Sequence, residues 1–387
     1  MKHLLIGQLG ANGDCLYATI LARQLRHDHP DAHITWAITS QCKGVLRNNP
    51  HIDAIWEIPM TGWEYQDVIW RVFEREALRR LARHEFDHAW LSQISPNNFH
   101  NYDGTIRPSI LRSYGAPITV PIENVIELDA AEQGQVAAFV ARSGLDAFEH
   151  RILFECSSRS GQSFITPDLA QDIAQRVYAA LPSACVLLST HLPIELRHAN
   201  SRNAGELSLR ETAGLTHHCT LFVGAGSGGT VAATSTAARQ LPMFQLLSAS
   251  TSVYASFAHD FEHYGLAHEH MVEMTREDPQ AIADAIVLAC CQGIAAAQEE
   301  FGETIPVRFE HYMKLIGDQL LRRGQFLDAA QSLLVTAGRY GWRPELRAFG
   351  RKIEPDLAQD PGWVQPHRRV FAEQFREHLH AATGDRA

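Results

Sequence analysis

The sequence predicts two consecutive α/β domains, each built on a doubly wound parallel sheet, followed by an all-α extension at the C-terminal end. Three observations support this prediction. Short apolar runs alternate with amphipathic helical segments twice along the chain, a glycine-rich turn follows one strand in each half, and strand-like runs become rare after the second half. We therefore expect domains at 1–147 and 148–300 and a helical tail at 301–387.

The composition is that of an ordinary globular protein and argues against several classes. Of 387 residues, 45% are apolar and 20% are charged. The net charge of −10 argues against a nucleic-acid partner, because such proteins usually carry a basic excess. The seven cysteines form no Cys-x-x-Cys pair, there is no signal peptide, and no apolar run reaches the ~18 residues of a membrane span. We expect a protein of the reducing cytoplasm, with room for peripheral contact at the inner face of a membrane.

The first half alternates strands and helices in the order typical of a parallel sheet. Strands are expected at 3–7, 34–38, 53–58 and 86–92, and helices at 15–26, 68–82 and 130–143. Between the first strand and the first helix, Gln8 to Asp14 form a glycine-rich turn. Since ligands of such sheets bind at the carboxyl ends of the strands, this turn lies where a site is expected.

The second half repeats the alternation of strands and helices, whereas the tail is expected to be helical throughout. Strands are expected at 152–156, 185–189, 219–223 and 243–247, and helices at 169–181, 209–217, 230–238 and 282–298. From Phe309 to Leu379 the pattern is helical, and its first part resembles a single tetratricopeptide unit. An unrelated helical hairpin fits this part equally well. In either case we expect the hairpin to pack on the second domain or on a protein partner.

The turn at Gly224–Thr230 is the segment around which we expect the site to be built. Four glycines in six residues follow a buried strand and precede a helix of small residues. This arrangement aims free backbone N–H groups and a helix dipole at an anion, and glycine lets the anion approach the backbone. The sequence therefore predicts a phosphate site here. A glycine turn that only lets the helix pack close to the strand is the alternative.

Two further motifs compete with this interpretation. Gly224-x-Gly226-x-x-Gly229 matches the dinucleotide fingerprint, but the next strand ends in Gln245-Leu-Leu-Ser, without the acidic residue that holds a ribose. A nicotinamide enzyme is therefore the weaker alternative. His84-Glu-Phe-Asp-His88 matches a zinc-protease signature, yet the second histidine lies in an expected strand, which would separate the two rings by ~13 Å. We expect no metal and no cofactor.

Two other sets of residues complete the expected chemistry. Ser157-Ser-Arg159-Ser-Gly follows the strand at 152–156 and offers hydroxyls, amides and one guanidinium to a phosphate, although a serine-rich surface turn would look the same. Asp14 ends the first glycine turn and opens the first helix. It is a candidate general base for an attacking hydroxyl, and a helix cap is its structural alternative.

These segments, in this order, resemble the heptosyltransferase-like glycosyltransferases of family 9. The resemblance rests on Gln8-Leu-Gly-Ala-Asn-Gly-Asp14-Cys-Leu and its following helix and strand, on Asn49-Pro-His-Ile-Asp-Ala-Ile-Trp-Glu-Ile58, and on Leu207-Ser-Leu-Arg-Glu-Thr-Ala-Gly-Leu215 before the second glycine turn. It covers about residues 1–295 and implies a GT-B fold, in which two Rossmann-like domains face each other across a cleft. It also implies metal-independent, inverting transfer from a nucleotide-diphosphate sugar.

By motif position, the resemblance implies a role for each candidate residue. Asp14 falls on the catalytic base, with Gly13 beside the donor and Asn12 on the acceptor side. The implied donor-binding residues are Ser157, Arg159, Ser189, Thr190, Glu195, Gly226, Ser227, Gly228, Gly229 and Thr230. Gly226 stands where the family usually has Asp or Asn, which leaves the donor open.

The sequence thus predicts an enzyme that transfers a sugar to a cell-surface glycan or glycolipid, such as a lipopolysaccharide. An interaction protein with a degenerate GT-B fold, which would bind a partner through its helical tail, is the alternative from another functional class.

Overall fold

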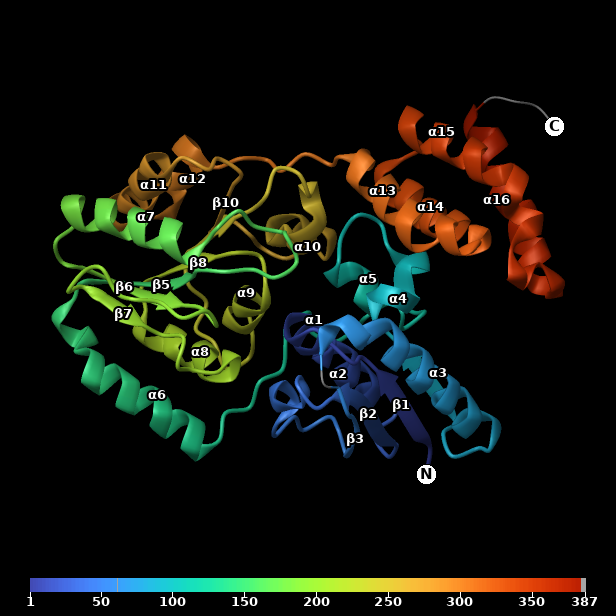
Figure 1. Cartoon of the computed structure of the whole chain (residues 1–387), viewed down its shortest axis with the longest axis horizontal. Coiled ribbons are helices and arrows are strands. Elements are labelled where there is room, and N and C mark those ends of the chain that lie inside the picture. The colour runs from blue at the N-terminus through green and yellow to red at the C-terminus, as the bar shows by residue number, and fades with distance from the viewer. Residues whose placement is uncertain (61, 384–387) are drawn as a thin grey trace.

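The computed structural model describes residues 1–60 and 62–383 and shows two lobes and a helical tail (Figure 1). Every strand pairs in parallel with its neighbours, as the sequence predicts for an α/β protein. The first sheet has the order β3-β2-β1-β4 and the second has the order β10-β9-β8-β5-β6-β7. The strands are β1 His3–Gly7, β2 His33–Thr39, β3 Ala54–Ile58, β4 His88–Leu91, β5 His150–Glu155, β6 Ala184–Ser189, β7 Ser201–Asn203, β8 Leu221–Gly224, β9 Met243–Leu246 and β10 Met271–Met274.

Helices cover both faces of each sheet and form the tail. Those of the lobes are α1 Asn12–Tyr17, α2 Thr19–Asp28, α3 Gln66–Ala82, α4 Ile94–Asn97, α5 Arg107–Arg112, α6 Ala130–Ser143, α7 Pro167–Ala180, α8 Leu209–Leu215, α9 Gly228–Ala233, α10 Phe257–His263, α11 Pro279–Gln292 and α12 Ile294–Phe301. Those of the tail are α13 Phe309–Gln319, α14 Phe326–Tyr340, α15 Pro344–Ile353 and α16 Pro366–Thr383.

The first sheet is buried on both faces because its central strand alternates its side chains between two cores. Leu4 packs with Leu16 and Ile20 of α1 and α2 on one face. Leu5, its neighbour on β1, packs with Trp70 of α3 on the other face. Apolar side chains on both faces of β1 explain why its sequence reads as a continuous apolar run.

The second sheet has the same double covering. Phe154 of β5 packs with helices α7 and α11, whereas Leu153 belongs to the core that also holds α8 and α9. Helix α6, which precedes the expected boundary at 147, lies along α8 in Figure 1. A buried ion pair joins them, with Glu132 Oε1 2.6 Å from Arg210 Nε. Helix α6 is therefore packed as part of the second lobe.

The tail contacts both lobes through its first two helices, which lie over α4 and α5 in Figure 1. Tyr312 of α13 stacks on Tyr102 of the first lobe, and its hydroxyl meets that of Ser332 on α14. Arg339 of α14 binds Asp103 of the first lobe and donates to the carbonyl of His259 on α10. The tail thus fixes the first lobe to the second.

Several element boundaries differ from the sequence-based expectation. The expected helix at 230–238 ends at Ala233, because Thr234 and Ser235 turn their hydroxyls back onto helix carbonyls. Gly293, with φ +93°, divides the expected helix at 282–298 into α11 and α12. The short strands β7 and β10 had no clear signal in the sequence.

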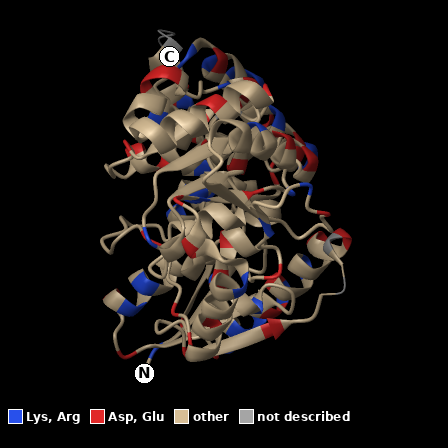
Figure 2. Cartoon of the chain, turned by 90° about the vertical axis from the view of Figure 1, so that its left-hand side faces the viewer, with Lys and Arg blue, Asp and Glu red and all other residues tan. Residues whose placement is uncertain are grey.

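The surface carries charges of both signs. In Figure 2, basic and acidic residues are interspersed over the side of the chain that faces the viewer, without a face of one sign. Among the described residues, no helix combines the length and the apolar composition needed to cross a bilayer.

Candidate functional site

The two glycine turns meet where the lobes face each other. A Cβ atom built on Gly13, in the first turn of α1, would lie 3.1 Å from the Cα of Gly228 at the start of α9. The backbones are therefore in contact, and any side chain at Gly13 would press on the opposite lobe. The carboxyl ends of β1 and β8 thus point toward one place, as the sequence predicts.

Asp14 lies at this junction with a carboxylate that is not neutralised by an ion pair within the part of the chain that the structure describes. It is partly exposed in the first turn of α1. Burial raises its pKa to about 6, against the opposing effects of Arg107 and of a hydrogen bond with the backbone of Ala11. The helix begins at Asn12 with Ala11 as its cap residue, so Asp14 is not the cap. A carboxylate with this pKa is basic enough to accept a proton near neutral pH.

The second glycine turn already holds an anion of the protein itself. Glu155 ends β5, is only 6% exposed, and points its carboxylate into the turn. Its Oε1 accepts hydrogen bonds from Ser227 Oγ at 2.5 Å and Gly229 N at 2.6 Å. Its Oε2 accepts from Ala225 N at 2.9 Å and Thr230 Oγ1 at 2.8 Å. The donors that were expected to receive a phosphate are therefore occupied.

The glycines of this turn make room for these internal contacts. A Cβ atom on Gly229 would lie 2.5 Å from Glu155 Oε1, and one on Gly224 would lie 2.4 Å from Thr230 Oγ1. Gly226, with φ +62°, donates its N–H to Gln245 Oε1. Ser227, Gly229 and Thr230 therefore donate to the Glu155 carboxylate in this structure, and their role in binding a sugar donor stays a prediction.

The loops after β5 and β6 bring a second polar cluster together, which we call the β5–β6 cluster: Ser157, Arg159, Thr190 and His191. Ser157 Oγ lies 3.1 Å from Thr190 Oγ1 and 3.3 Å from His191 Nδ1. Arg159 Nε donates to His191 Nε2 at 3.1 Å. Burial and the Arg159 guanidinium lower the pKa of His191, and its neutral ring accepts from Arg159 through Nε2 while Nδ1–H faces Ser157.

The remaining candidates are placed less closely together. Ser189 uses its backbone carbonyl to accept from Cys156 at the end of the neighbouring strand. Glu195 is exposed on the following loop, and within residues 1–60 and 62–383 no hydrogen bond or ion pair connects it with the β5–β6 cluster. Asn12 has a buried Oδ1 without a hydrogen-bond donor in the described structure. Such an atom next to Asp14 is free to accept from a bound molecule.

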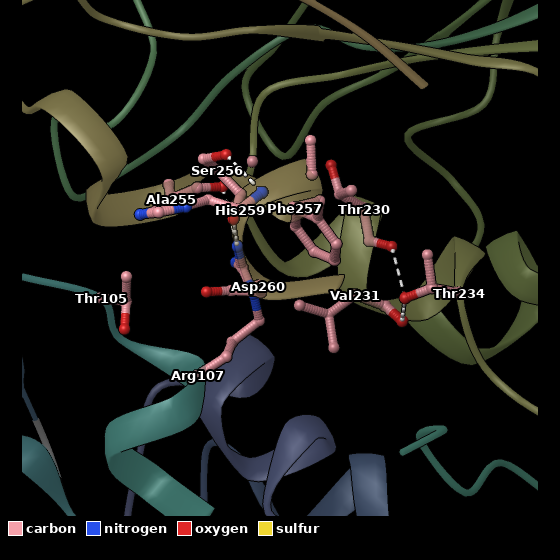
Figure 3. Close-up of polar contacts among 12 residues, drawn as sticks. Thr105, Arg107, Thr230, Val231, Thr234, Ala255, Ser256, Phe257, His259 and Asp260 are labelled. Atoms are coloured by element: carbon pink, nitrogen blue, oxygen red, sulfur yellow. Dashed lines mark hydrogen bonds and ion pairs between the residues drawn. The ribbon is translucent and has the colours of Figure 1, made fainter. Parts of the chain in front are cut away.

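Arg107 is a residue of the junction that the sequence analysis missed. It extends from α5 of the first lobe to α10 of the second, as Figure 3 shows. Its Nε lies 2.5 Å from Asp260 Oδ2, its Nη2 donates to the carbonyls of Ala255 and Ser256, and its guanidinium stacks 3.6 Å above the Phe257 ring. Burial raises the pKa of Asp260 to about 6, and Arg107 opposes this rise. Arg107 therefore joins the lobes and also influences Asp14.

No group of three or more His, Cys, Asp or Glu side chains suited to a metal ion occurs among the described residues. His84 lies in the turn after α3 with φ +58°, and His88 is the first residue of β4, so His84-Glu-Phe-Asp-His88 does not form a helix.

The two facing α/β lobes with parallel sheets define a GT-B-type architecture, and comparison with solved structures agrees. The crystal structure of the family 9 glycosyltransferase from Veillonella parvula is 16% identical, with a TM-score of 0.50 over 83% of this chain and 98% of that chain. The ADP-heptose lipopolysaccharide heptosyltransferase II of E. coli is 18% identical, with a TM-score of 0.49 over 76% and 99%. No family model and no curated protein sequence matches the chain. At 16% identity, the likeness to the Veillonella parvula structure supports the fold alone.

Proposed function

We propose that this protein is an inverting, metal-independent glycosyltransferase that uses Asp14 as its general base. The observation that carries the proposal is an unpaired, partly exposed carboxylate with a pKa of about 6, placed where the two lobes touch. A base with a pKa near the working pH is the type that general base catalysis favours. The fold of facing lobes supports the same conclusion, because it is shared with a family 9 glycosyltransferase.

In the proposed reaction, a hydroxyl oxygen of the acceptor attacks the anomeric carbon of the donor sugar. The new carbon–oxygen bond forms as the bond from the anomeric carbon to the diphosphate oxygen breaks. The hydroxyl proton goes to the Asp14 carboxylate, and the nucleoside diphosphate leaves with the bonding electron pair. One displacement inverts the anomeric configuration. Backbone amides, hydroxyls and the guanidinium of Arg159 would stabilise the charge of the leaving diphosphate without a metal ion.

The donor is a nucleotide-diphosphate sugar and the acceptor a glycan or glycolipid of the cell surface. Structures that resemble this chain include an E. coli heptosyltransferase with ADP. We place the enzyme in the cytoplasm, with peripheral contact at the inner membrane face where a lipid-linked acceptor would be reached.

The test is release of nucleoside diphosphate from a panel of ADP-, UDP- and GDP-sugars in the presence of cell-envelope glycolipid extracts. We expect acceptor-dependent release with at least one donor, together with a glycosylated product detected by mass spectrometry. If every donor is left intact and no product forms with any extract, the transferase proposal fails.

A second function is favoured by one specific observation, the Glu155 carboxylate in the glycine turn. A turn filled in this way is what a degenerate GT-B protein that only binds a partner would retain. The tail could supply the binding face, but its first helices are already covered by the chain itself. Stabilisation of the protein by a nucleoside diphosphate in a thermal-shift measurement would favour the enzyme over this alternative.

A further inference from the structure

The carboxylate of Glu155 occupies the glycine turn, where the sequence predicted a phosphate site. Four hydrogen bonds from two backbone amides and two hydroxyls converge on it, and it is almost fully buried. The site is therefore chemically an anion site, since donors converge on both oxygens of one carboxylate. The anion in this site is a side chain of the protein itself, Glu155 at the end of the neighbouring strand β5.

The same device recurs in this lobe at a place for which no ligand is expected. Glu273 of β10 accepts hydrogen bonds from Ser256 Oγ at 2.6 Å, Phe257 N at 2.8 Å and Ala258 N at 3.1 Å at the start of α10. Both carboxylates thus satisfy helix N-terminal amides that would otherwise be unpaired. The recurrence indicates that a strand carboxylate can take over this role permanently.

A diphosphate cannot share the turn with Glu155. Its oxygens would need the same donors, and two negative groups at hydrogen-bond distance repel each other. Free donors lie instead in the β5–β6 cluster, whose Ser157 and Arg159 follow Glu155 by only two and four residues along the chain. The Nε of Arg159 is held by His191, and its two Nη groups have no hydrogen-bond or ion-pair partner among the described residues. The guanidinium is thus oriented by His191, and its Nη groups can still donate to a phosphate.

We propose that Glu155 is a resident anion that bars phosphate from the glycine turn and makes Arg159 the main phosphate-binding side chain. This inference rests on the proposed function in one respect, that the protein binds a nucleoside diphosphate. Glu155 is then a specificity-determining residue, because its charge weakens the binding of doubly charged leaving groups. Removal of this charge would open a second anion site in the glycine turn.

The test is calorimetric titration of the full chain with ADP, UDP and GDP. We expect Arg159→Ala to weaken binding at least tenfold and Ser227→Ala to change it less than twofold. Arg176→Ala is the matched control, because Arg176 lies on α7 of the same lobe and contacts Gln280. We expect Glu155→Gln to bind at least fivefold more tightly, and Glu155→Gln with Ser227→Ala to lose that gain, since Ser227 would then contact the phosphate.

The outcomes separate the two proposals. A tenfold loss in Ser227→Ala alone would mean that phosphate already displaces Glu155, and equal affinities of Glu155→Gln and the wild type would mean that its charge bars nothing. Either result overturns this inference and leaves the transferase proposal standing. Binding by Glu155→Gln but not by the wild type would overturn the transferase proposal and, within this inference, the assignment of Arg159 as the phosphate-binding side chain, whereas binding by neither protein overturns both proposals. If circular dichroism shows that Glu155→Gln does not fold, the nucleotide affinities of Ser227→Ala and Arg159→Ala still test the inference. A larger loss in Arg159→Ala than in Ser227→Ala supports it, and the reverse order overturns it.

Discussion

Two glycine-rich turns lie opposite each other at the junction of the lobes, and each is associated with one carboxylate. In the first turn, Asp14 belongs to the turn itself, is partly exposed and forms no ion pair in the described chain. In the second, Glu155 comes from a neighbouring strand, is buried and accepts four hydrogen bonds. Among the described residues, the first carboxylate therefore has no ion-pair partner, whereas the second has four hydrogen-bond donors.

The difference shows that the motif of strand, glycine turn and helix does not by itself define a phosphate site. What decides is the residue that the adjacent strand presents to the turn. At β5 this residue is Glu155, and its carboxylate supplies the acceptor that a phosphate would otherwise provide. The glycines of the second turn are needed for this internal contact, because a Cβ on Gly229 would collide with Glu155.

The largest expected effect concerns the reactive carboxylate. Replacing Asp14 by Asn keeps the shape and removes the base, so turnover should fall by about 10²- to 10⁴-fold while donor affinity stays within about threefold. The activity of the wild type should rise with pH through the pKa of about 6, since the base must be deprotonated. Steady-state rates over a range of pH values check both expectations. Asp31→Asn, at an exposed site before β2, is the control, and comparable rates in Asp14→Asn and this control would remove the base role.

The second effect concerns the satisfied carboxylate. Glu155→Ala leaves the amides of Ala225 and Gly229 and the hydroxyl of Ser227 without their acceptor, so the free energy of unfolding should fall by about 3 kcal/mol or more. Urea denaturation measures it. Glu149→Ala, an exposed neighbour, should change stability by less than about 0.5 kcal/mol.

Added formate or acetate should restore part of the stability lost in Glu155→Ala, because a small carboxylate fits the vacated donors. Chloride at the same ionic strength is the control for general salt effects. A Glu155→Ala variant as stable as the wild type would show that the turn does not depend on its internal anion.

The sheets and part of the candidate site could be predicted from the sequence, because their patterns lie within short segments of the chain. The alternation of apolar runs was sufficient for the two parallel sheets and for every described strand except β7 and β10, because double covering requires continuous apolar strands. The meeting of Ser157, Arg159 and Thr190 was predictable too, since neighbouring parallel strands end at one edge. The β7 strand has only three residues, too few for a periodic signal, and the four residues of β10 include the charged Glu273, which interrupts the apolar run.

The contacts of Glu155 and Arg107 were not predictable by the same means. Glu155 lies 70 residues before Ala225, and nothing local in either segment indicates that they pair. Its only signal is a carboxylate at the end of an otherwise apolar strand, which implies a buried partner. Arg107 and Asp260 are 153 residues apart and belong to different lobes, so only the docking of the lobes brings them together.

A third effect tests the packing of the second turn. Gly229→Ala places a Cβ 2.5 Å from Glu155 Oε1, and the carboxylate must shift away from donors that hold it, which should cost about 1–3 kcal/mol of stability. Gly134→Ala is the matched control, because Gly134 lies in α6 with no atom within 4 Å of an added Cβ, and it should gain about 0.5–1 kcal/mol. Equal stability of these two variants in thermal denaturation would contradict the close approach of Glu155 to the turn.

The smallest effect concerns the stability associated with the reactive carboxylate. The pKa of Asp14 in the folded protein, about 6, lies above its ordinary value of 3.8, so the folded state binds this proton more tightly than the unfolded state. The stability that protonation supplies is complete below about pH 4 and is lost as the pH rises through about 6. Asn cannot ionise, so Asp14→Asn should match the wild type at pH 4.

At pH 8, Asp14→Asn should be more stable than the wild type by about 1–2 kcal/mol. A shift of about two pKa units corresponds to about 2.7 kcal/mol, and partial exposure of the side chain reduces this figure. Glu155→Gln should instead lower stability, because its hydrogen-bond donors lose a charged acceptor. Urea denaturation at pH 8 measures the change in the free energy of unfolding for both variants. An increase in Asp14→Asn and a decrease in Glu155→Gln would confirm that the charge of Asp14 destabilises the fold and that the charge of Glu155 stabilises it. A loss of stability in both would show that Asp14 also serves the fold.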